Sequence, residues 1–307
     1  MLARKLERDG PPSDAPSVVI PNSVSSVITE IHPRRSALQG RHARALPIQP
    51  GRLENLAELL WTGMAIDEPV PWESDAFPPN IEAVIAALQH GGTSAPILRV
   101  MASVTIALGE AASSELRSGN TMRLARRLVY AYAGCLAHLR SPGRFLHPKA
   151  GESMAALALR ALDAKPSPSS EAAMNGLFIC CADHELSPAT FAARVVASTG
   201  AGLHACLIAA LGGQSGLVLG GGCDRAEDFF ATRQSPARPR ELAAASARGE
   251  VKVHGFESQL YPHGDPRAEY LLELAAGLAA AKALADIQSL VEQCRPRAAR
   301  RCRWSSA

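Results

Sequence analysis

The sequence predicts an all-α fold, and three observations support that class. Hydrophobic residues make up 47% of the 307 residues while aromatic residues make up only 5%, so the core must consist mainly of Ala, Leu and Val side chains, which suit closely packed helices. Apolar residues recur at helical spacing in several segments, and no segment alternates apolar and polar residues over the length of a strand. Prolines, glycines and capping residues stand where such helices would begin and end.

The beginning of the chain differs from the rest. Residues 1–50 are rich in Pro, Ser and Arg and contain one short apolar run, Ser17–Ile20, so we expect an N-terminal arm that is partly irregular. From Gly51 the pattern becomes helical. A first helix is predicted by leucines at helical spacing, and it should end at Gly63, since glycine is typical of helix C-termini. The leucines are Leu53, Leu56, Leu59 and Leu60.

Further helices follow from the same spacing and from their start signals. They are predicted over about 79–89, 96–109, 121–139 and 154–162. Residues 165–170 contain only Lys, Pro and Ser, which indicates a linker or surface loop.

Two later helices are predicted by a capping residue followed by proline. Ser187–Pro188 fit the N-cap and first helical position of a helix that reaches about Ala210. Asp265–Pro266 fit the same positions of a helix that reaches about Ala285.

One long stretch carries no formal charge. It runs from Val195 to Cys223, a length that would suit a membrane span. The pair Gly212-Gly213 and the run Gly216–Gly222 interrupt any continuous apolar helix, so we interpret the stretch as a buried helix followed by a glycine-rich turn and expect no membrane partner. The glycine run also lacks the Lys and the Ser or Thr that a phosphate-binding loop requires.

Charge and cysteine content limit the partners and the location. Five arginines lie within residues 295–303, and removing them from the formal net charge of +3 leaves −2 for the other residues, so no nucleic-acid surface is expected on the folded body. The seven cysteines show no regular spacing and include the adjacent Cys180 and Cys181, which indicates a reducing compartment. The N-terminus lacks the apolar core of a signal peptide, so we expect a cytoplasmic protein. Zinc-ligand spacing does not occur, and no metal cofactor is expected.

The candidate binding residues lie beside predicted helix starts. Asp183, His184 and Glu185 come just before Pro188, where backbone N–H groups favour anions, so His184 could donate to a substrate carboxylate or carbonyl. The alternative is a capping cluster in which an acid neutralises the helix end and His184 is solvated. Arg267 lies in the first turn of the last predicted helix, where a cation opposes the helix dipole. A bound carboxylate is a reasonable partner for it, and a surface arginine without a ligand is the alternative.

Three stretches resemble motifs of the citrate synthase family, in the order in which that family carries them, and an earlier stretch resembles the family more weakly. The family has a Cys- or His-Ala-Asp-His-Glu block with Thr-Phe-x-Ala-Arg and Ala-Ser-Thr, then a Gly-Pro-Leu-His-Gly-Gly loop, then Gly-Phe-Gly-His followed by Tyr and Asp-Pro-Arg-Ala. The similar stretches here are Cys181–Thr199, Gly216–Gly221, Gly255–Tyr261 with Asp265–Ala268, and, more weakly, Leu56–Gly63. The resemblance covers about 25–285.

The resemblance implies a substrate and a reaction. His184 and Arg267 would hold oxaloacetate or a related 2-oxo dicarboxylate. In the family, an aspartate removes a proton from the methyl group of acetyl-CoA, the loop histidine stabilises the enol, and a second histidine polarises the oxaloacetate carbonyl. This chain has Leu219 and Ser258 at the two histidine positions, and no aspartate is recognisable, so none of these catalytic residues is intact. Losing one positioned donor or acid costs on the order of 10² to 10⁴ in rate.

The same resemblance predicts the organisation of the chain. We expect a large helical domain over 51–222, an incomplete small helical domain over 223–287, and a basic tail outside the family over 288–307, from a truncated or frame-shifted end. Family members are homodimers, and the helices around 94–112 and 188–210 could supply the interface.

Two functions remain open on these grounds. The first is condensation of acetyl-CoA or another short acyl-CoA with oxaloacetate to give citrate and CoA, with the acyl-CoA as a substrate and no cofactor. The second is a catalytically inactive homologue that keeps a carboxylate site or acts as a dimer partner.

Overall fold

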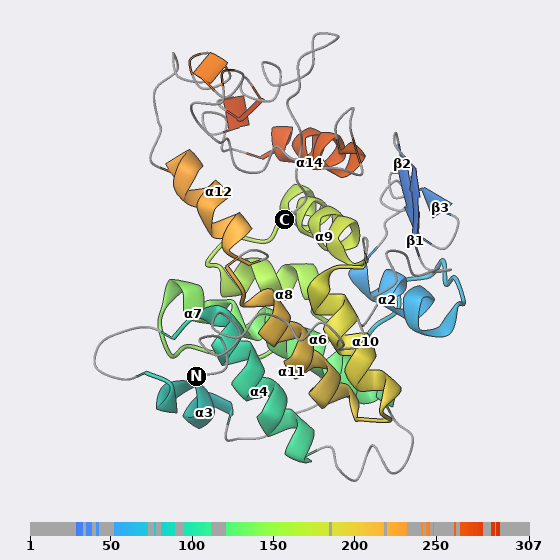
Figure 1. Cartoon of the computed structure of the whole chain (residues 1–307), viewed down its shortest axis with the longest axis vertical. Helices are drawn as coiled ribbons and strands as arrows, with labels where there is room; N and C mark the ends of the chain where they lie inside the picture. Colours follow the sequence, from blue (N-terminus) through green and yellow to red (C-terminus); the bar gives the residue numbers. More distant parts are fainter. Residues whose placement is uncertain are drawn as a thin grey trace, which may run out of the picture.

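The fold is built from helices around one main core, as the computed structural model shows in Figure 1. The residues that the structure describes are 29–32, 35–38, 41–42, 52–72, 77, 81–89, 95–111, 121–183, 186–217, 220–231, 241, 244–245, 248, 261, 265–278, 284–285 and 287–288. The predicted all-α class is confirmed.

A small antiparallel sheet lies in the N-terminal arm, where no strand was predicted. Its strands β1 (Thr29–His32), β2 (Arg35–Leu38) and β3 (Arg41–His42) follow one another in sequence order. In the register of the first pair, Thr29 faces Leu38 and His32 faces Arg35. The two longer strands, Thr-Glu-Ile-His and Arg-Ser-Ala-Leu, do not alternate apolar and polar residues, which is why sequence reasoning missed them.

The first half of the helical body contains six described helices. They are α2 (Leu53–Thr62), α3 (Ile81–Ala87), α4 (Ile97–Ala111), α6 (Thr121–Cys135), α7 (Ala137–Arg140) and α8 (Met154–Ala161). The predicted end of α2 is confirmed, because Gly63 has a left-handed φ of 76° and its N–H donates to the Leu59 carbonyl at 2.8 Å. The helix predicted over 121–139 is divided at Leu136 into α6 and α7.

The second half departs from prediction at three helix ends. Its helices are α9 (Pro168–Cys181), α10 (Pro188–Ser198), α11 (Leu203–Gln214), α12 (Gly221–Ala231) and α14 (Pro266–Ala276). Residues 165–170 are not wholly loop, because Ser167 caps α9 and Pro168 begins it. The helix expected to reach Ala210 is two helices, since Gly200 adopts a left-handed φ of 79° between them. The last predicted helix stops at Ala276 rather than Ala285.

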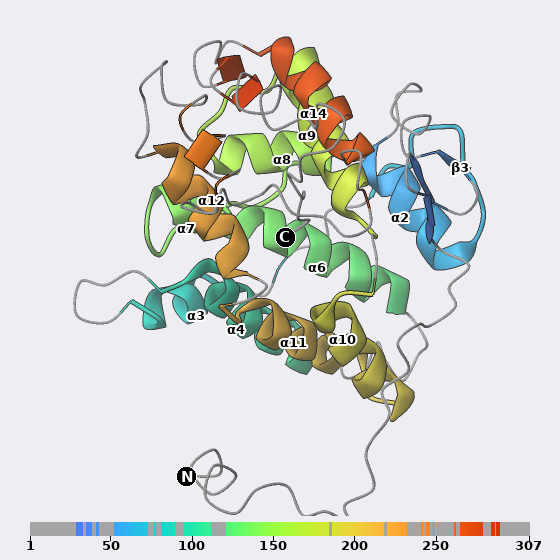
Figure 2. The same ribbon diagram turned by 45° about the horizontal axis from the view of Figure 1, so that its top comes forward.

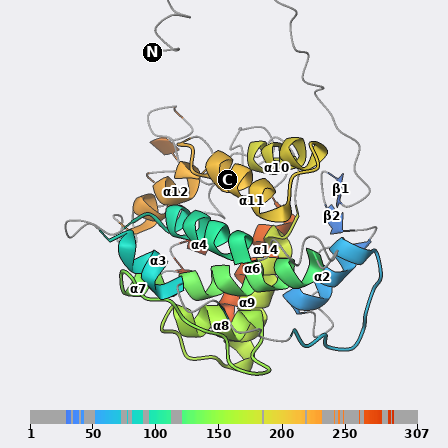
Figure 3. The same cartoon turned by 90° about the horizontal axis from the view of Figure 1, so that it is seen from below.

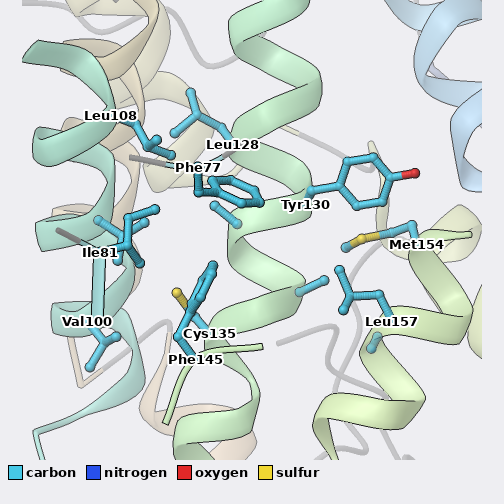
Figure 4. Close-up of a cluster of buried hydrophobic side chains, with 14 of the residues drawn as sticks. Phe77, Ile81, Val100, Leu108, Leu128, Tyr130, Cys135, Phe145, Met154 and Leu157 are labelled. Carbon is cyan, nitrogen blue, oxygen red and sulfur yellow. The ribbon is translucent and has the colours of Figure 1, made fainter. Parts of the chain in front are cut away.

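The main core lies between α3, α4, α6 and α8 (Figure 4). Its fully buried aliphatic residues recur at helical spacing along each of these helices, for example Val100, Val104 and Leu108 on α4. Phe77 and Phe145 meet edge to face with ring centroids 5.6 Å apart.

An outer layer is formed by α10 and α11, which pack on each other, with α11 against α4 (Figures 2 and 3). We expected a buried helix here, but Cys206 is the one buried residue reported for α11. The rest of α11 is half-buried apart from the exposed Gly212. In the described part of the chain, none of the helices combines the length and the apolar character needed to cross a membrane.

Candidate functional site

The candidate site lies where the end of α9 meets the start of α14. The two helices pack side by side (Figure 1). Their contact is close at Gly176 of α9, where an added Cβ would overlap the Cδ1 of Leu274 and would lie 3.2 Å from the Cε1 of Tyr270. The helices therefore approach one another through a position that has no side chain.

The other side of α9 is fixed by α2. Ile179 forms a buried cluster with Leu56 and Leu59, and the Leu53 N–H donates to the Oδ1 of Asn175 at 3.1 Å. Apolar contacts and a hydrogen bond therefore both hold α9 on α2.

Asp265 both caps α14 and binds the side chain of Arg267. Its Oδ1 accepts a hydrogen bond from the Arg267 backbone N–H at 2.9 Å, which confirms the predicted N-cap. The Arg267 Nε lies 3.0 Å from Oδ1 and 3.1 Å from Oδ2, and Nη2 lies 2.6 Å from Oδ2. The exposed fractions of the two side chains are 15% for Arg267 and 11% for Asp265. This is a forked ion pair that is mostly withdrawn from water.

The guanidinium also reaches across to α9. The Arg267 Nη1 donates to the Cys180 carbonyl at the long distance of 3.5 Å. A guanidinium has five N–H groups, and the contacts recorded among the described residues use one each from Nε, Nη1 and Nη2. Among the described residues, one N–H on Nη1 and one on Nη2 have no partner, and two such donors match the two oxygens of a carboxylate.

The electrostatics keep this arginine charged. Burial alone would lower the pKa of Arg267, but its hydrogen bonds and charge interaction with Asp265 outweigh burial and raise that pKa above its usual value. Burial raises the pKa of the neighbouring Cys180 thiol to about 11, so this thiol is neutral near pH 7. Burial also raises the pKa of the Tyr270 hydroxyl.

The acid-His-acid cluster is described only in part. Asp183 follows the end of α9, and burial raises the pKa of its carboxyl although the charge of Arg194 opposes this. His184 and Glu185 lie outside the described residues, as do Leu219 and Ser258. Ser187 is the N-cap of α10, since its Oγ accepts from the Thr190 N–H at 3.2 Å. Asp183 therefore does not occupy that cap.

Sequence reasoning identified Arg267 but not its surroundings. It expected a bound carboxylate to balance the arginine at the start of the helix, and in the structure the carboxylate of Asp265 does so. The carbonyl of Cys180 and the space at Gly176 had no sequence signal, because each contact joins residues that are far apart in the chain.

Comparison with known proteins identifies related sequences. The sequence model of a family described as "Citrate synthase, C-terminal domain" matches residues 22–303. Citrate synthase 2 of Bacillus subtilis is 32% identical over 114 residues, which are 37% of this chain and 31% of that protein. The 2-methylcitrate synthase of Shewanella oneidensis is 29% identical over 136 residues, which are 44% of this chain and 33% of that protein. The chain thus spans about a third of the length of these curated relatives.

Solved structures with the same fold cover more of the chain. The citrate synthase of Pyrobaculum aerophilum superposes with a TM-score of 0.74 at 21% identity, covering 89% of this chain and 74% of that one. The citrate synthase of Thermoplasma acidophilum, solved in a ternary complex with carboxymethyl coenzyme A and oxaloacetate, superposes with a TM-score of 0.72 at 19% identity and the same two coverages. At these identities the likeness shows the fold.

Proposed function

Because this chain belongs to the citrate synthase family, we propose that it binds oxaloacetate or a related 2-oxo dicarboxylate through Arg267 and His184. The observation that carries the proposal is the burial, charge and hydrogen bonding of the Arg267 side chain. Its side chain is mostly buried, permanently charged and held by Asp265, and two of its N–H groups have no partner among the described residues.

The pairing with Asp265 supports a ligand of defined shape. The ion pair has no net charge, so recognition of a substrate carboxylate would depend on the direction of the remaining N–H groups. Asp265 also fixes the guanidinium in one orientation, which lowers the entropy that binding would otherwise lose. His184, three residues beyond the α9 end, is proposed as the second donor.

The reaction proposed for this site is the condensation of a short acyl-CoA with oxaloacetate. A base takes a proton from the methyl group of acetyl-CoA, the resulting enol attacks the oxaloacetate carbonyl, and hydrolysis of the thioester releases citrate and CoA. Weakly acidic C–H groups need a positioned base, and the charge that develops on the two oxygens needs donors. No cofactor beyond the acyl-CoA substrate takes part in this proposal.

A specific observation favours a second candidate, a catalytically inactive homologue. The positions that carry histidine in the family motifs are Leu219 and Ser258 here. Leucine can neither donate nor accept a proton, and the loss of one such group slows a reaction by a factor on the order of 10² to 10⁴. The carboxylate site would persist in such a protein without rapid turnover.

Release of free CoA thiol separates the two candidates. The full chain is mixed with oxaloacetate and either acetyl-CoA or propionyl-CoA in the presence of EDTA, and thiol release is followed with a chromogenic disulfide. Turnover clearly above the rate without protein, abolished by Arg267→Ala, supports condensation and contradicts the inactive candidate. No turnover, together with calorimetric binding of oxaloacetate, supports the inactive candidate.

We also propose a homodimer with α4, α10 and α11 at its interface. A helix that is apolar on all faces is normally buried, yet α11 is half-buried in the single chain. Ile106 of α4 and Val195 of α10 are 48% and 49% exposed. Light scattering after size exclusion tests the proposal, since a monomer at micromolar concentration contradicts it. The cytoplasmic location remains a prediction.

A further inference from the structure

We propose that Gly176 is a positioning residue for Arg267, because it lets α14 lie close enough to α9 to hold the guanidinium against the Cys180 carbonyl. This inference rests on the proposed oxaloacetate site for its functional meaning. Its structural half, the contact between the two helices, is independent of any ligand.

The two helices present matching faces. Gly176 and Cys180 are four residues apart on α9, so they share one face of that helix, one turn apart. Arg267, Tyr270 and Leu274 are spaced by three and four residues on α14 and also share a face. The recorded contacts pair these faces: Tyr270 and Leu274 cover Gly176, and Arg267 reaches the carbonyl of Cys180.

Among the described elements, α14 packs most extensively on α9. None of the α14 residues is buried, whereas Tyr261 is fully buried and the N-cap Asp265 is largely buried. The packing partners of α14 among the described elements are α9 and, to a smaller extent, β2. The contact of α14 with α9 therefore contributes directly to the position of Arg267.

A side chain at position 176 would disturb the contact between α9 and α14, and a larger side chain would disturb it more. The nearest atom to an added Cβ is the terminal Cδ1 of Leu274, which can rotate away at modest cost, so alanine should be partly tolerated. A leucine would also meet the Tyr270 ring and would push α14 outward. Since the Arg267 to Cys180 hydrogen bond is already 3.5 Å long, a small outward movement breaks it.

The test compares Gly176→Ala and Gly176→Leu with the wild type and with Gly212→Ala and Gly212→Leu. Gly212 is a matched control, because it is also a helical glycine but an added Cβ there meets nothing within 4 Å. Both glycines gain the same intrinsic helix propensity on substitution, so a difference between them isolates the contact with α14. Amide hydrogen exchange of residues 266–276 measures how firmly α14 packs on α9, and calorimetry measures the affinity of the protein for oxaloacetate.

We expect Gly176→Leu to lower the exchange protection of α14 and the affinity for oxaloacetate by about tenfold or more, and Gly176→Ala to act in the same direction but less. The double variant Gly176→Leu with Leu274→Ala should recover most of both, because truncation at 274 makes room for the new side chain. The Gly212 variants should change neither.

Two results would overturn the inference. One is unchanged α14 protection in Gly176→Leu. The other is lowered exchange protection of α14 with unchanged oxaloacetate affinity, which would mean that the contact between α14 and α9 does not position Arg267. If the wild type does not bind oxaloacetate, the proposed function fails. The exchange data, including those of the double variant Gly176→Leu with Leu274→Ala, then decide whether Gly176 allows the close contact between α14 and α9.

Discussion

Replacing Asp265 with alanine should destabilise the start of α14 through two separate losses. The N-cap hydrogen bond to the Arg267 N–H disappears, which typically costs about 1 kcal/mol. The Arg267 guanidinium, 15% exposed, also loses the carboxylate that neutralises it, and leaving a mostly buried charge without its partner costs about 3 kcal/mol. The expected total is about 4 kcal/mol in the free energy of opening α14.

The variant Asp265→Asn separates these losses. Asparagine is as good an N-cap as aspartate, and its amide oxygen can still accept from the Arg267 Nε, so part of the second loss is avoided and the cost should be about 2 kcal/mol. Asp224→Ala is the matched control, since Asp224 is an exposed acid in the first turn of α12 and its removal should leave α14 unaffected.

The assay is amide hydrogen exchange of residues 266–276 at one pH and temperature. A change of 1.4 kcal/mol is a tenfold change in the opening equilibrium, so Asp265→Ala should lower protection by about 10³ or abolish it, and Asp265→Asn by about 10 to 30-fold. Equal protection in the two variants, or a loss below about threefold in Asp265→Ala, would refute the reasoning that Asp265 holds both the cap and the guanidinium.

Three further outcomes are expected. Glu58→Ala should lower the free energy of unfolding, measured in urea, by about 3 kcal/mol, because the buried Trp72 Nε1 and the Arg126 guanidinium both donate to the Glu58 Oε1. Glu58→Gln keeps an acceptor at this position and should lower it by about 1 kcal/mol. Gly134→Ala should cost about 2 kcal/mol by thermal unfolding, because the new methyl group would overlap the Leu146 carbonyl oxygen, and a gain in stability would contradict the close packing there. Burial opposes ionisation of Glu152, but hydrogen bonds from Arg160 and the Lys149 N–H outweigh it and hold the pKa of Glu152 below its ordinary 4.5. A carboxyl group whose pKa is lower in the folded protein than in the unfolded chain stabilises the fold at pH values above the unfolded pKa, and this stabilisation is lost as the pH falls. Glu152→Gln should therefore flatten the decline of the free energy of unfolding below about pH 4.5, and an unchanged slope would contradict the assignment.

Sequence signals located those helix ends that depend on local chemistry. Ser187 with Pro188 and Asp265 with Pro266 act through hydrogen bonds within the first turn, and Gly63 acts through its own backbone angle, so all three could be recognised from neighbouring residues. The start of α9 at Pro168 was hidden because the Pro- and Ser-rich stretch that caps it is also typical of a linker. The break at Gly200 was missed because apolar residues continue on both sides of it.

The candidate site shows the same division. Arg267 could be predicted, since its place in a helix start left its charge unexplained. Its ion pair with Asp265, two residues earlier, was within reach of the same local reasoning. The approach of α14 to Gly176 was not, because the contact joins residues more than ninety positions apart and depends on how whole helices pack.

The central claim is that Arg267 binds a substrate carboxylate, and calorimetric titration of oxaloacetate into the wild type and Arg267→Lys tests it most directly. Lysine keeps the charge but lacks the planar fork, so we predict binding to the wild type and an affinity weaker by about tenfold or more in the variant. Equal affinities in the two proteins, or no binding to a wild type that is shown to be folded, would contradict the account.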